Sequence, residues 1–218
     1  MNGRARATWL AAAPKIKLLP DLEKRAPYPL SWDEQARLFA ELPGHLAAMA
    51  LFAVNTGCRD GEICRLRWNW EEELPGLNTS VFVVPDRYVK NGDDRLVVLN
   101  RIASSVIDTQ RGKHREMVFT FNGKPVAHML NSAWKKARVR AGLPQVRVHD
   151  LKHTFGRRLR AAGVSFEDRQ DLLGHRSGRI TTHYSAAELS RLIAAANRVC
   201  ERKSKKPELV MLRRLNVS

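Results

Sequence analysis

Apolar and polar positions along the chain predict helices first, then two strands, then helices again. A capping box, in which glutamate follows serine after three residues, stands at Ser31–Glu34 and predicts a helix that runs to about Leu42. A second, mostly apolar helix is expected from about His45 to Asn55, buried on most sides. Thr56-Gly57 breaks it, and Asp60 stands where a third helix can begin.

Two apolar, β-branched runs over residues 80–84 and 95–99 predict strands. Lys90-Asn91-Gly92-Asp93 lies between them, and Asn-Gly is the strongest short pattern for a β-hairpin. We therefore expect an antiparallel pair of strands with Lys90 at or beside the tip of a tight turn. A short extended piece at 118–120 precedes a second Asn-Gly turn at 122–123.

The remaining pattern is helical. Helices are expected from Arg101 onward and over residues 128–141, 149–162, 167–173 and 187–200. Within the helix that begins near His149, Leu151, Phe155 and Leu159 recur every four residues and form the buried stripe. A different face of that helix carries His149, Lys152, His153 and Gly156. Together these elements predict an α+β fold, mainly α-helical, with a small antiparallel β-sheet.

Residues 174–184 interrupt the apolar pattern with two histidines, two arginines, two threonines and a tyrosine. A segment this polar predicts a surface loop that presents one side chain, that of Tyr184. The helix expected over 187–200 carries an apolar stripe, which could pack on a neighbouring protomer or fold back onto its own domain.

The two ends of the chain differ from its middle. Residues 1–30 are interrupted by four prolines and predict a linker or the end of something upstream. Residues 31–200 form the expected folded domain, and residues 201–218 form a basic tail.

Composition narrows the class of protein. A net charge of +16 over 218 residues is typical of nucleic-acid binders. Three cysteines at irregular spacing fit neither a disulfide framework nor a zinc ribbon. The longest apolar run, 46–54, is about half of a membrane span. We expect a cytoplasmic protein that binds no membrane.

Four separate patches carry groups suited to phosphate chemistry: Arg59, Lys90, His149 with Lys152, and His175. Fixed cations stabilise the charge that spreads over a phosphodiester during transfer, and the arginine fork grips two oxygens at once. A tyrosine hydroxyl is a weak nucleophile at its ordinary pKa, so Tyr184 needs such neighbours.

The patches lie in motifs of a known family. Thr56-Gly57-Cys58-Arg59-Asp60-Gly61-Glu62 resembles the T-G-x-R-x-x-E box of the tyrosine recombinases, the phage integrase family. His149-Asp150-Leu151-Lys152-His153-Thr154-Phe155 resembles their H-x-L-R-H-T-F box. Leu172-Leu173-Gly174-His175 and Thr181-Thr182-His183-Tyr184 resemble their L-L-G-H…T-T-x-x-Y box, with one residue rather than two before the tyrosine.

The resemblance implies a site-specific recombinase that works through a 3′-phosphotyrosyl link. Residues 31–200 would be its catalytic integrase domain, and residues 1–30 a linker or the remnant of an upstream DNA-binding domain. Tyr184 would be the nucleophile, Arg59 the phosphate clamp and Lys90 the acid that protonates the departing 5′-oxygen. His149 would move protons and contact the phosphate, and His175 would donate a hydrogen bond to it. Glu62 and His153 would support these groups. Neither a metal nor another cofactor is implied.

The resemblance also implies double-stranded DNA as partner, a homo-tetramer on DNA and a protein encoded by a bacterium or phage that works at the nucleoid. A monomer is possible without DNA. One position departs from the family: Lys152 stands where arginine is usual, which keeps the charge and loses the bidentate fork. We expect Lys152→Arg to retain or raise cleavage and Lys152→Ala to lower it by orders of magnitude.

Structural interpretations of the same residues stay open at this point. Tyr184 could be a packing residue, and Arg59 with Glu62 a surface ion pair. Arg87 and Arg95 rival Lys90, and His175 could cap the helix before it. His149 and His153 with a third histidine, His175 or His183, would suit zinc, but the H-E-x-x-H glutamate is absent.

Two other functions also stay open. One is a DNA-binding integrase remnant without useful catalysis, and the other is an enzyme like the type IB topoisomerases.

Overall fold

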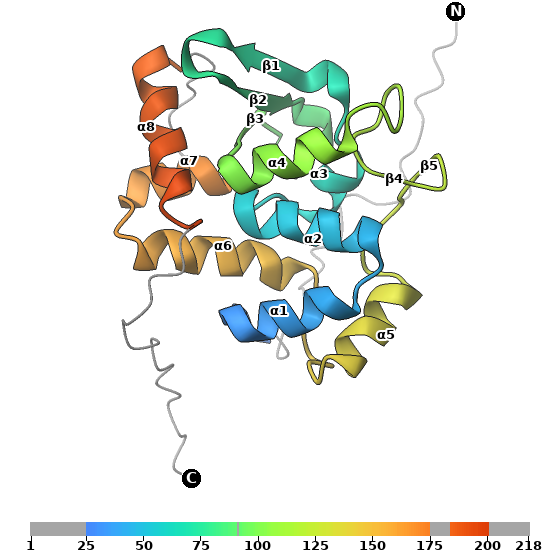
Figure 1. Ribbon diagram of the computed structural model, residues 1–218. Coiled ribbons are helices and arrows are strands. Elements are labelled where there is room, and N and C mark those ends of the chain that lie inside the picture. Colours follow the sequence, from blue (N-terminus) through green and yellow to red (C-terminus); the bar gives the residue numbers. More distant parts are fainter. Residues whose placement is uncertain (1–24, 91, 175–183, 201–218) are drawn as a thin grey trace, which may run out of the picture.

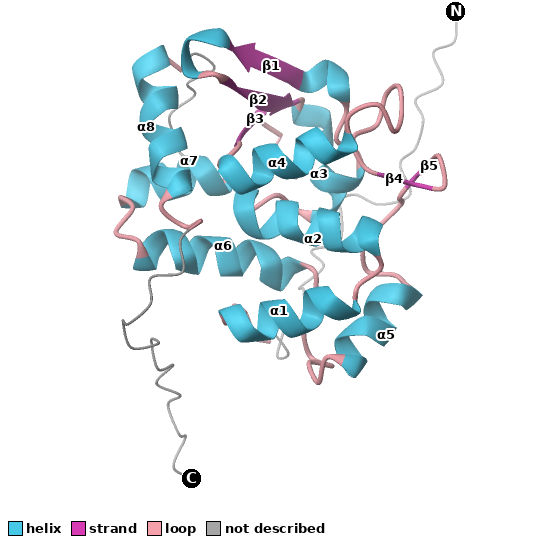
Figure 2. Cartoon of the chain, viewed as in Figure 1, coloured by secondary structure: helices cyan, strands magenta, loops and turns pink. Residues whose placement is uncertain are grey.

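The computed structural model describes residues 25–90, 92–174 and 184–200. The helices are α1 (Trp32–Glu41), α2 (Gly44–Thr56), α3 (Asp60–Cys64), α4 (Arg101–Gln110), α5 (Ser132–Arg140), α6 (His149–Ala161), α7 (Phe166–Leu173) and α8 (Ala186–Asn197). The strands are β1 (Glu71–Leu74), β2 (Thr79–Val84), β3 (Arg95–Val98), β4 (Thr120–Phe121) and β5 (Lys124–Pro125). Helix dominates, and β1 to β3 lie together at one edge of the domain (Figure 1, Figure 2). The predicted fold class is confirmed.

The first helices begin and end where the sequence predicts. Ser31 caps α1 as one half of a capping box, with its Oγ accepting from the backbone N–H of Glu34 at 3.2 Å. Gly57 ends α2 in the left-handed conformation, with φ of 65°. A Cβ at this position would lie 2.8 Å from Phe155, so α2 and α6 meet at a point that only glycine fits.

The sheet has the antiparallel order β1-β2-β3. The predicted strand pair is confirmed, and Lys90 lies in a turn as predicted, with the backbone N–H of Gly92 donating to the carbonyl oxygen of Val89 at 3.1 Å. The prediction that this turn joins the two strands directly is wrong. Val84 pairs with Arg95, so the connection runs over residues 85–94 and contains a 3₁₀ turn at Asp86–Tyr88. Strand β1 was not predicted, because its Glu-Glu-Glu-Leu sequence is polar and it forms the exposed edge of the sheet.

The turn between β4 and β5 agrees with the sequence prediction, whereas the start of α5 does not. Asn122 and Gly123 form the turn of the β4–β5 hairpin with φ of 50° and 71°, as predicted. Helix α5 starts four residues later than expected, at Ser132, because the side chain of Asn131 accepts from the backbone N–H of Trp134 at 3.1 Å and caps the helix there.

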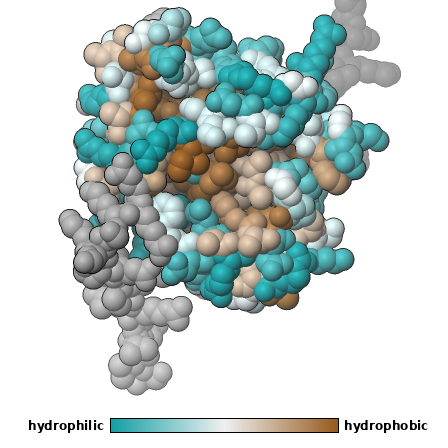
Figure 3. Space-filling view, viewed as in Figure 1, coloured by the Kyte–Doolittle hydropathy of each residue, from teal (hydrophilic) through white to brown (hydrophobic). Residues whose placement is uncertain are grey.

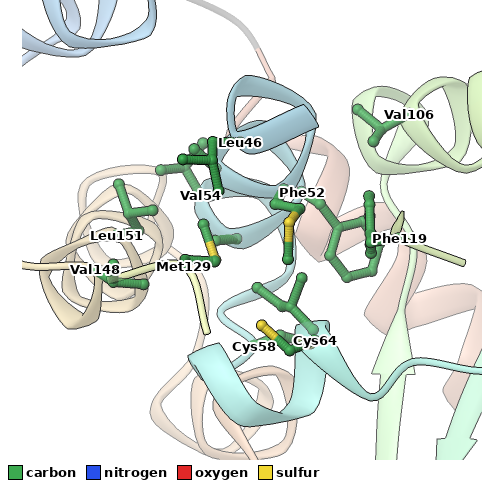
Figure 4. Packing of buried hydrophobic residues seen from close by; sticks show 14 of the residues in the cluster. Leu46, Phe52, Val54, Cys58, Cys64, Val106, Phe119, Met129, Val148 and Leu151 are labelled. Atoms are coloured by element: carbon green, nitrogen blue, oxygen red, sulfur yellow. The ribbon is translucent and has the colours of Figure 1, made fainter. Parts of the chain in front are cut away.

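The main hydrophobic core surrounds α2, whose residues Leu46, Phe52 and Val54 are fully buried. Figure 4 shows these side chains against others from α3, α4, α6 and the segment before β4. Phe52 meets Phe119 edge to face, with ring centroids 5.3 Å apart. Packing on most sides explains why the sequence of α2 is almost continuously apolar.

A second core cluster joins α6, α7 and α8 to β3. Phe155 and Leu159 of α6, the predicted buried stripe, contact this cluster together with Leu172 and Leu192, and all four are buried. The apolar stripe of α8 therefore folds back onto its own domain. Of the two arrangements that the sequence left open, this is the one in which α8 packs on its own domain.

The segment that precedes α1 lies against α6. The carboxylate of Asp150 accepts from the backbone N–H of Tyr28 at 3.0 Å and from that of Arg147 at 2.8 Å. The backbone N–H of Leu30 donates to the hydroxyl of Thr154 at 2.9 Å, and Leu30 is buried. Residues 25–30 are thus attached to α6, while the predicted domain boundary at residue 30 stays a prediction.

One face of the molecule is partly apolar. Figure 3 shows hydrophobic side chains in the middle of this face, over α2, with hydrophilic side chains around them. Ala47, Ala48 and Leu51 of α2 are partly buried and pack on the main core. Across the described ranges, every helix is too short or too polar to cross a bilayer.

Candidate active site

The site is built around one buried carboxylate, that of Glu62 on α3. Its Oε1 accepts from the Arg59 guanidinium at 2.8 Å, and its Oε2 accepts from the backbone N–H of Arg59 at 2.8 Å. Arg59 is the residue before α3, so the same carboxylate caps the helix and holds the arginine side chain. Glu62 is only 2% exposed, so a surface ion pair is not the correct interpretation of this i, i+3 pair.

A second arginine reaches the same carboxylate from the sheet. The Arg95 guanidinium, from the first residue of β3, donates to Glu62 Oε2 and to the carbonyl oxygen of Thr56, the latter at 3.4 Å. Burial alone would raise the pKa of Glu62, but Arg95 and Arg59 hold it below its usual value. The carboxyl is therefore ionised between two guanidinium groups.

Lys152 on α6 completes a group of buried charges. Its ammonium donates to the carbonyl oxygen of Leu173 at the end of α7, and its residue is 4% exposed. Burial, then Arg95 and Arg59, lower the pKa of Lys152 to about 7, while Glu62 opposes the shift. A lysine in this position can change charge near neutral pH, which an arginine cannot.

His149 lies beside this group, at the surface and one turn before His153 on α6. Partial burial, then His153, Lys152 and Arg59, lower the pKa of His149, so its imidazole is neutral near pH 7 and can accept a proton. The two rings meet edge to face with centroids 4.7 Å apart. Within the described ranges no group of three or more possible ligands could hold a metal, and His175 and His183 lie outside those ranges.

Tyr184 lies just before α8 and packs against the second core cluster. Burial, then Asp171 and Glu188, raise the pKa of its hydroxyl, so the group is protonated near neutral pH. No hydrogen bond between described residues joins Tyr184 to Arg59 or Lys152.

The structure thus brings some predicted site residues together and leaves others apart. Arg59, Glu62, His149 and Lys152 form one cluster, which His153 flanks. Lys90 is exposed in the connection between β2 and β3. His175 lies outside the described residues, immediately after the Leu173-Gly174 end of α7.

Sequence reasoning missed the part that Arg95 plays. It considered Arg95 only as a rival to Lys90 at the turn, whereas the side chain is buried on Glu62. The available indication was its position: Arg95 is a charged residue at the start of an otherwise apolar strand. Such a charge, if it points inward, requires a buried partner.

Comparison with known proteins decides the family. The model of the phage integrase family matches residues 30–191. The chain belongs to this family. It is 30% identical to the integrase of Salmonella phage P22 over 189 residues, which are 81% of this chain and 48% of that protein. It is 26% identical to the tyrosine recombinase XerC of Staphylococcus haemolyticus, over 69% of this chain and 52% of that protein.

Solved structures of family members share the fold. The integrase from mycobacterium phage Brujita superposes with a TM-score of 0.61 at 22% identity, covering 85% of this chain and 62% of that one. A lambda integrase tetramer bound to a Holliday junction gives a TM-score of 0.55 at 20% identity, covering 72% of this chain and 49% of that one. The chain spans about half the length of the curated relatives it matches.

The chemical capacity of this phage integrase site follows from its charges. Arg59, Arg95 and Lys152 supply three cations around the single carboxylate of Glu62, so positive charge remains in excess. The side chain of Arg59 is 20% exposed and is the one of the two arginines that solvent reaches. Such a site favours a phosphate group, whose oxygens accept from a guanidinium edge.

Proposed function

We propose that this chain is a site-specific recombinase that cleaves and rejoins double-stranded DNA through Tyr184. Membership of the phage integrase family supports this proposal, since the matched region contains every motif residue from Arg59 to Tyr184. The observation that carries it is the cluster of Arg59, Glu62, His149 and Lys152. Residues of two motifs that are distant in the sequence meet there, at the ionised carboxylate of Glu62.

The reaction consists of two transesterifications. In cleavage, the Tyr184 oxygen attacks the phosphorus, the bond from phosphorus to the 5′-oxygen breaks, and a 3′-phosphotyrosyl link forms. The tyrosine loses its proton and the departing 5′-oxygen gains one. In rejoining, a 5′-hydroxyl attacks the same phosphorus and Tyr184 leaves. One phosphodiester bond is exchanged for another, so no external energy source is needed.

Each group has a role that suits its surroundings. Arg59 grips the non-bridging oxygens, and Glu62 holds it in place. Neutral His149 accepts the proton that the Tyr184 hydroxyl gives up, a transfer that its lowered pKa permits near neutral pH. Lys152 contributes positive charge below about its own pKa of 7.

Two further residues complete the proposed reaction: Lys90, in the connection between β2 and β3, and His175, which lies outside the described residues. Lys90 protonates the 5′-oxygen, and His175 donates a hydrogen bond to the phosphate. Both assignments rest on the family motifs. Because Lys90 is exposed in a long connection and Tyr184 is packed on the second core cluster, DNA binding must bring both toward Arg59.

The proposed partner is duplex DNA, and the proposed assembly on it is a homo-tetramer. A net charge of +16 supports attraction to the DNA backbone, and a lambda integrase of the same fold is known as a tetramer on a Holliday junction. We place the activity at the nucleoid, in the cytoplasm of a bacterium.

Trapping the covalent intermediate tests the proposal. The full chain is incubated with duplexes whose central sequence is randomised and which carry a nick close to the cleavage position. The short 5′-hydroxyl fragment then diffuses away, so the phosphotyrosyl link persists and resists SDS. Adducts recovered over several rounds also identify the preferred DNA sequence.

Wild-type protein should form adducts on a preferred sequence, and Tyr184→Phe should form none. DNA binding by the wild type without an adduct would instead favour the integrase remnant. Relaxation of supercoils without sequence preference would favour the topoisomerase-like enzyme. An adduct that persists in Tyr184→Phe would show that another residue is the nucleophile.

A further inference from the structure

Arg95 is a buried charge that connects three parts of the domain. Its residue is 2% exposed at the start of β3. Its guanidinium donates to Glu62 of α3 and to the carbonyl oxygen at the end of α2, and it lies directly against Gly174 at the end of α7. A Cβ at Gly174 would be only 2.8 Å from Arg95 Nε and 2.9 Å from Cδ. The guanidinium thus occupies the space that a larger residue there would need.

A gain in fold stability does not by itself explain why Arg95 is buried against Glu62. Removing a guanidinium from water is costly, and a buried ion pair often stabilises a fold no better than apolar residues of equal size. Arg95 Nε also finds no hydrogen-bond partner among the residues that the structure describes. A buried charge whose hydrogen bonding is incomplete is better explained by what it positions.

Arg95 fixes the orientation of the Glu62 carboxylate. Its guanidinium takes Oε2 of Glu62, which leaves Oε1 facing the guanidinium of Arg59 at 2.8 Å. Without Arg95, that carboxylate would keep its two bonds to Arg59, from the guanidinium to Oε1 and from the backbone N–H to Oε2, but would lose the bond that holds it to β3, so Glu62 and Arg59 could move together. The direction of the Arg59 fork therefore depends on Arg95 through Glu62.

Arg95 and Lys152 also meet at the end of α7. Lys152 donates to the Leu173 carbonyl oxygen, and Arg95 lies against Gly174. Cations suit this place, because the C-terminal end of a helix carries partial negative charge. The next residue in the chain is His175, so the point where the third family motif begins is held by these two side chains.

We propose that Arg95 is a positioning residue of the cleavage reaction, which holds Arg59 through Glu62 and fixes the end of α7 from which His175 follows. This inference rests on the proposed function. Arg95 does not touch DNA: its side chain is 1% exposed, behind Glu62. Its contribution is to the geometry of groups that do, and small displacements of such groups have large effects on rate.

The test measures cleavage separately from DNA affinity and from folding. The duplex recovered with the wild-type chain is used at saturating concentration, well below the thermal unfolding transition of each variant. Arg95→Met removes the charge, and Arg95→Lys keeps it without the fork. Arg111→Met is the matched control, because Arg111 pairs with Glu71 at 2.7 Å on the outer strand β1.

We expect Arg95→Met to lower the cleavage rate about a hundredfold at unchanged DNA affinity, and Arg95→Lys to restore part of the loss. Arg111→Met should cleave within about twofold of the wild type. The double variant Glu62→Met/Arg95→Met removes both partners of the buried pair and should fold, yet it should remain as slow as Arg95→Met.

A second readout concerns pH. Arg95 is one of the charges that lower the pKa of Lys152, so Arg95→Met should move any alkaline loss of activity to higher pH. A purely structural arginine would lower the folded fraction and leave this profile unchanged.

The outcomes separate the two proposals. If the wild-type chain forms no adduct, the proposed function fails. If it forms the adduct and a folded Arg95→Met or Glu62→Met/Arg95→Met variant cleaves at the wild-type rate, the positioning role of Arg95 is overturned while the function stands.

Discussion

Replacing Lys152 by arginine should change how the enzyme depends on pH. Lys152 is 4% exposed and lies between Arg59 and Arg95, which together with burial lower its pKa from 10.5 to about 7. The charges that face it are those two arginines, which disfavour its protonation, and the Glu62 carboxylate, which favours it; burial raises the pKa of the Cys58 thiol and keeps it neutral. An arginine at this position would stay protonated throughout.

The size of the effect follows from the shifted pKa. The difference from an ordinary lysine corresponds to about 5 kcal/mol against the charged form. One pH unit above the pKa, only about a tenth of the molecules carry the charge. The rate of the wild-type chain should therefore fall about tenfold for each pH unit above about 7. The Lys152→Arg rate should stay flat, which gives it an advantage of about a hundredfold near pH 9.

The assay is single-turnover cleavage of the selected nicked duplex at a DNA concentration far below saturation. Under this condition the pH profile reports groups of the free protein, before the DNA phosphate adds its own negative charge. Tyr184 stays protonated over the same range because its pKa is raised, and the lowered pKa of His149 affects only the acid side. Titration of Tyr184 and of His149 affects the wild type and Lys152→Arg alike.

Lys152→Met provides a second comparison if arginine does not fit. It lacks the charge at every pH, so its rate should be low and lack the alkaline loss. The free energy of unfolding should change in the direction opposite to the cleavage rate. Below about pH 7 the buried lysine is charged, which destabilises the folded state, and this destabilisation disappears as the pH rises toward about 10.5. The wild-type free energy of unfolding should therefore increase over this window relative to that of Lys152→Met. Coincident alkaline profiles for wild type and a folded Lys152→Arg would refute the reasoning.

Two further predictions concern folding. Gly57→Ala should lower the free energy of unfolding in urea by about 3 kcal/mol, because φ is 65° and the new Cβ would lie 2.8 Å from Phe155. Gly112→Ala is the control: its φ is 77° with nothing within 4 Å, so about 1 kcal/mol is expected, and equal losses would contradict the contact with Phe155. Asp150→Asn should cost about 1–3 kcal/mol and speed proteolysis within residues 25–30, because Asp150 accepts from the backbone of Tyr28; unchanged digestion would mean that Asp150 does not hold that segment.

The sequence predicted the elements well where one local pattern decides them. The capping box at Ser31, the glycine that ends α2 and the stripe of Phe155 and Leu159 each depend on neighbours within one or two helical turns. The turn after β2 was different. Asn91-Gly92 favours a tight hairpin, but pairing of Val84 with Arg95 fixes a longer connection.

The site was predicted in part, for a related reason. The i, i+3 spacing of Arg59 and Glu62 is visible in the sequence, whereas the burial of Glu62 and its contact with Arg95 of β3 are not. In the sequence, Lys152 is only one of several polar residues on the same helix face. Its burial and its hydrogen bond to the Leu173 carbonyl oxygen at the end of α7 become visible only in the folded structure. Contacts between elements distant in sequence leave no local pattern.

Family motifs and geometry contribute different information here. The motifs name Tyr184 and Lys90, which the described structure does not bring to Arg59, and His175, which lies outside the described residues. The geometry names Arg95, which no motif considered above contains. The two sources agree on Arg59, Glu62, His149 and Lys152, and these residues form the firmest part of the proposed site.

The proposed reaction requires that Tyr184 becomes covalently joined to DNA. Digestion of the SDS-resistant adduct with trypsin and nuclease, followed by mass spectrometry, locates the attached nucleotide. Cleavage after Arg179 and Arg191 releases a peptide that contains Tyr184 as its only tyrosine. The account predicts a 3′-linked nucleotide on Tyr184 in that peptide. A nucleotide on any other residue, or an adduct that forms equally in Tyr184→Phe, would contradict it.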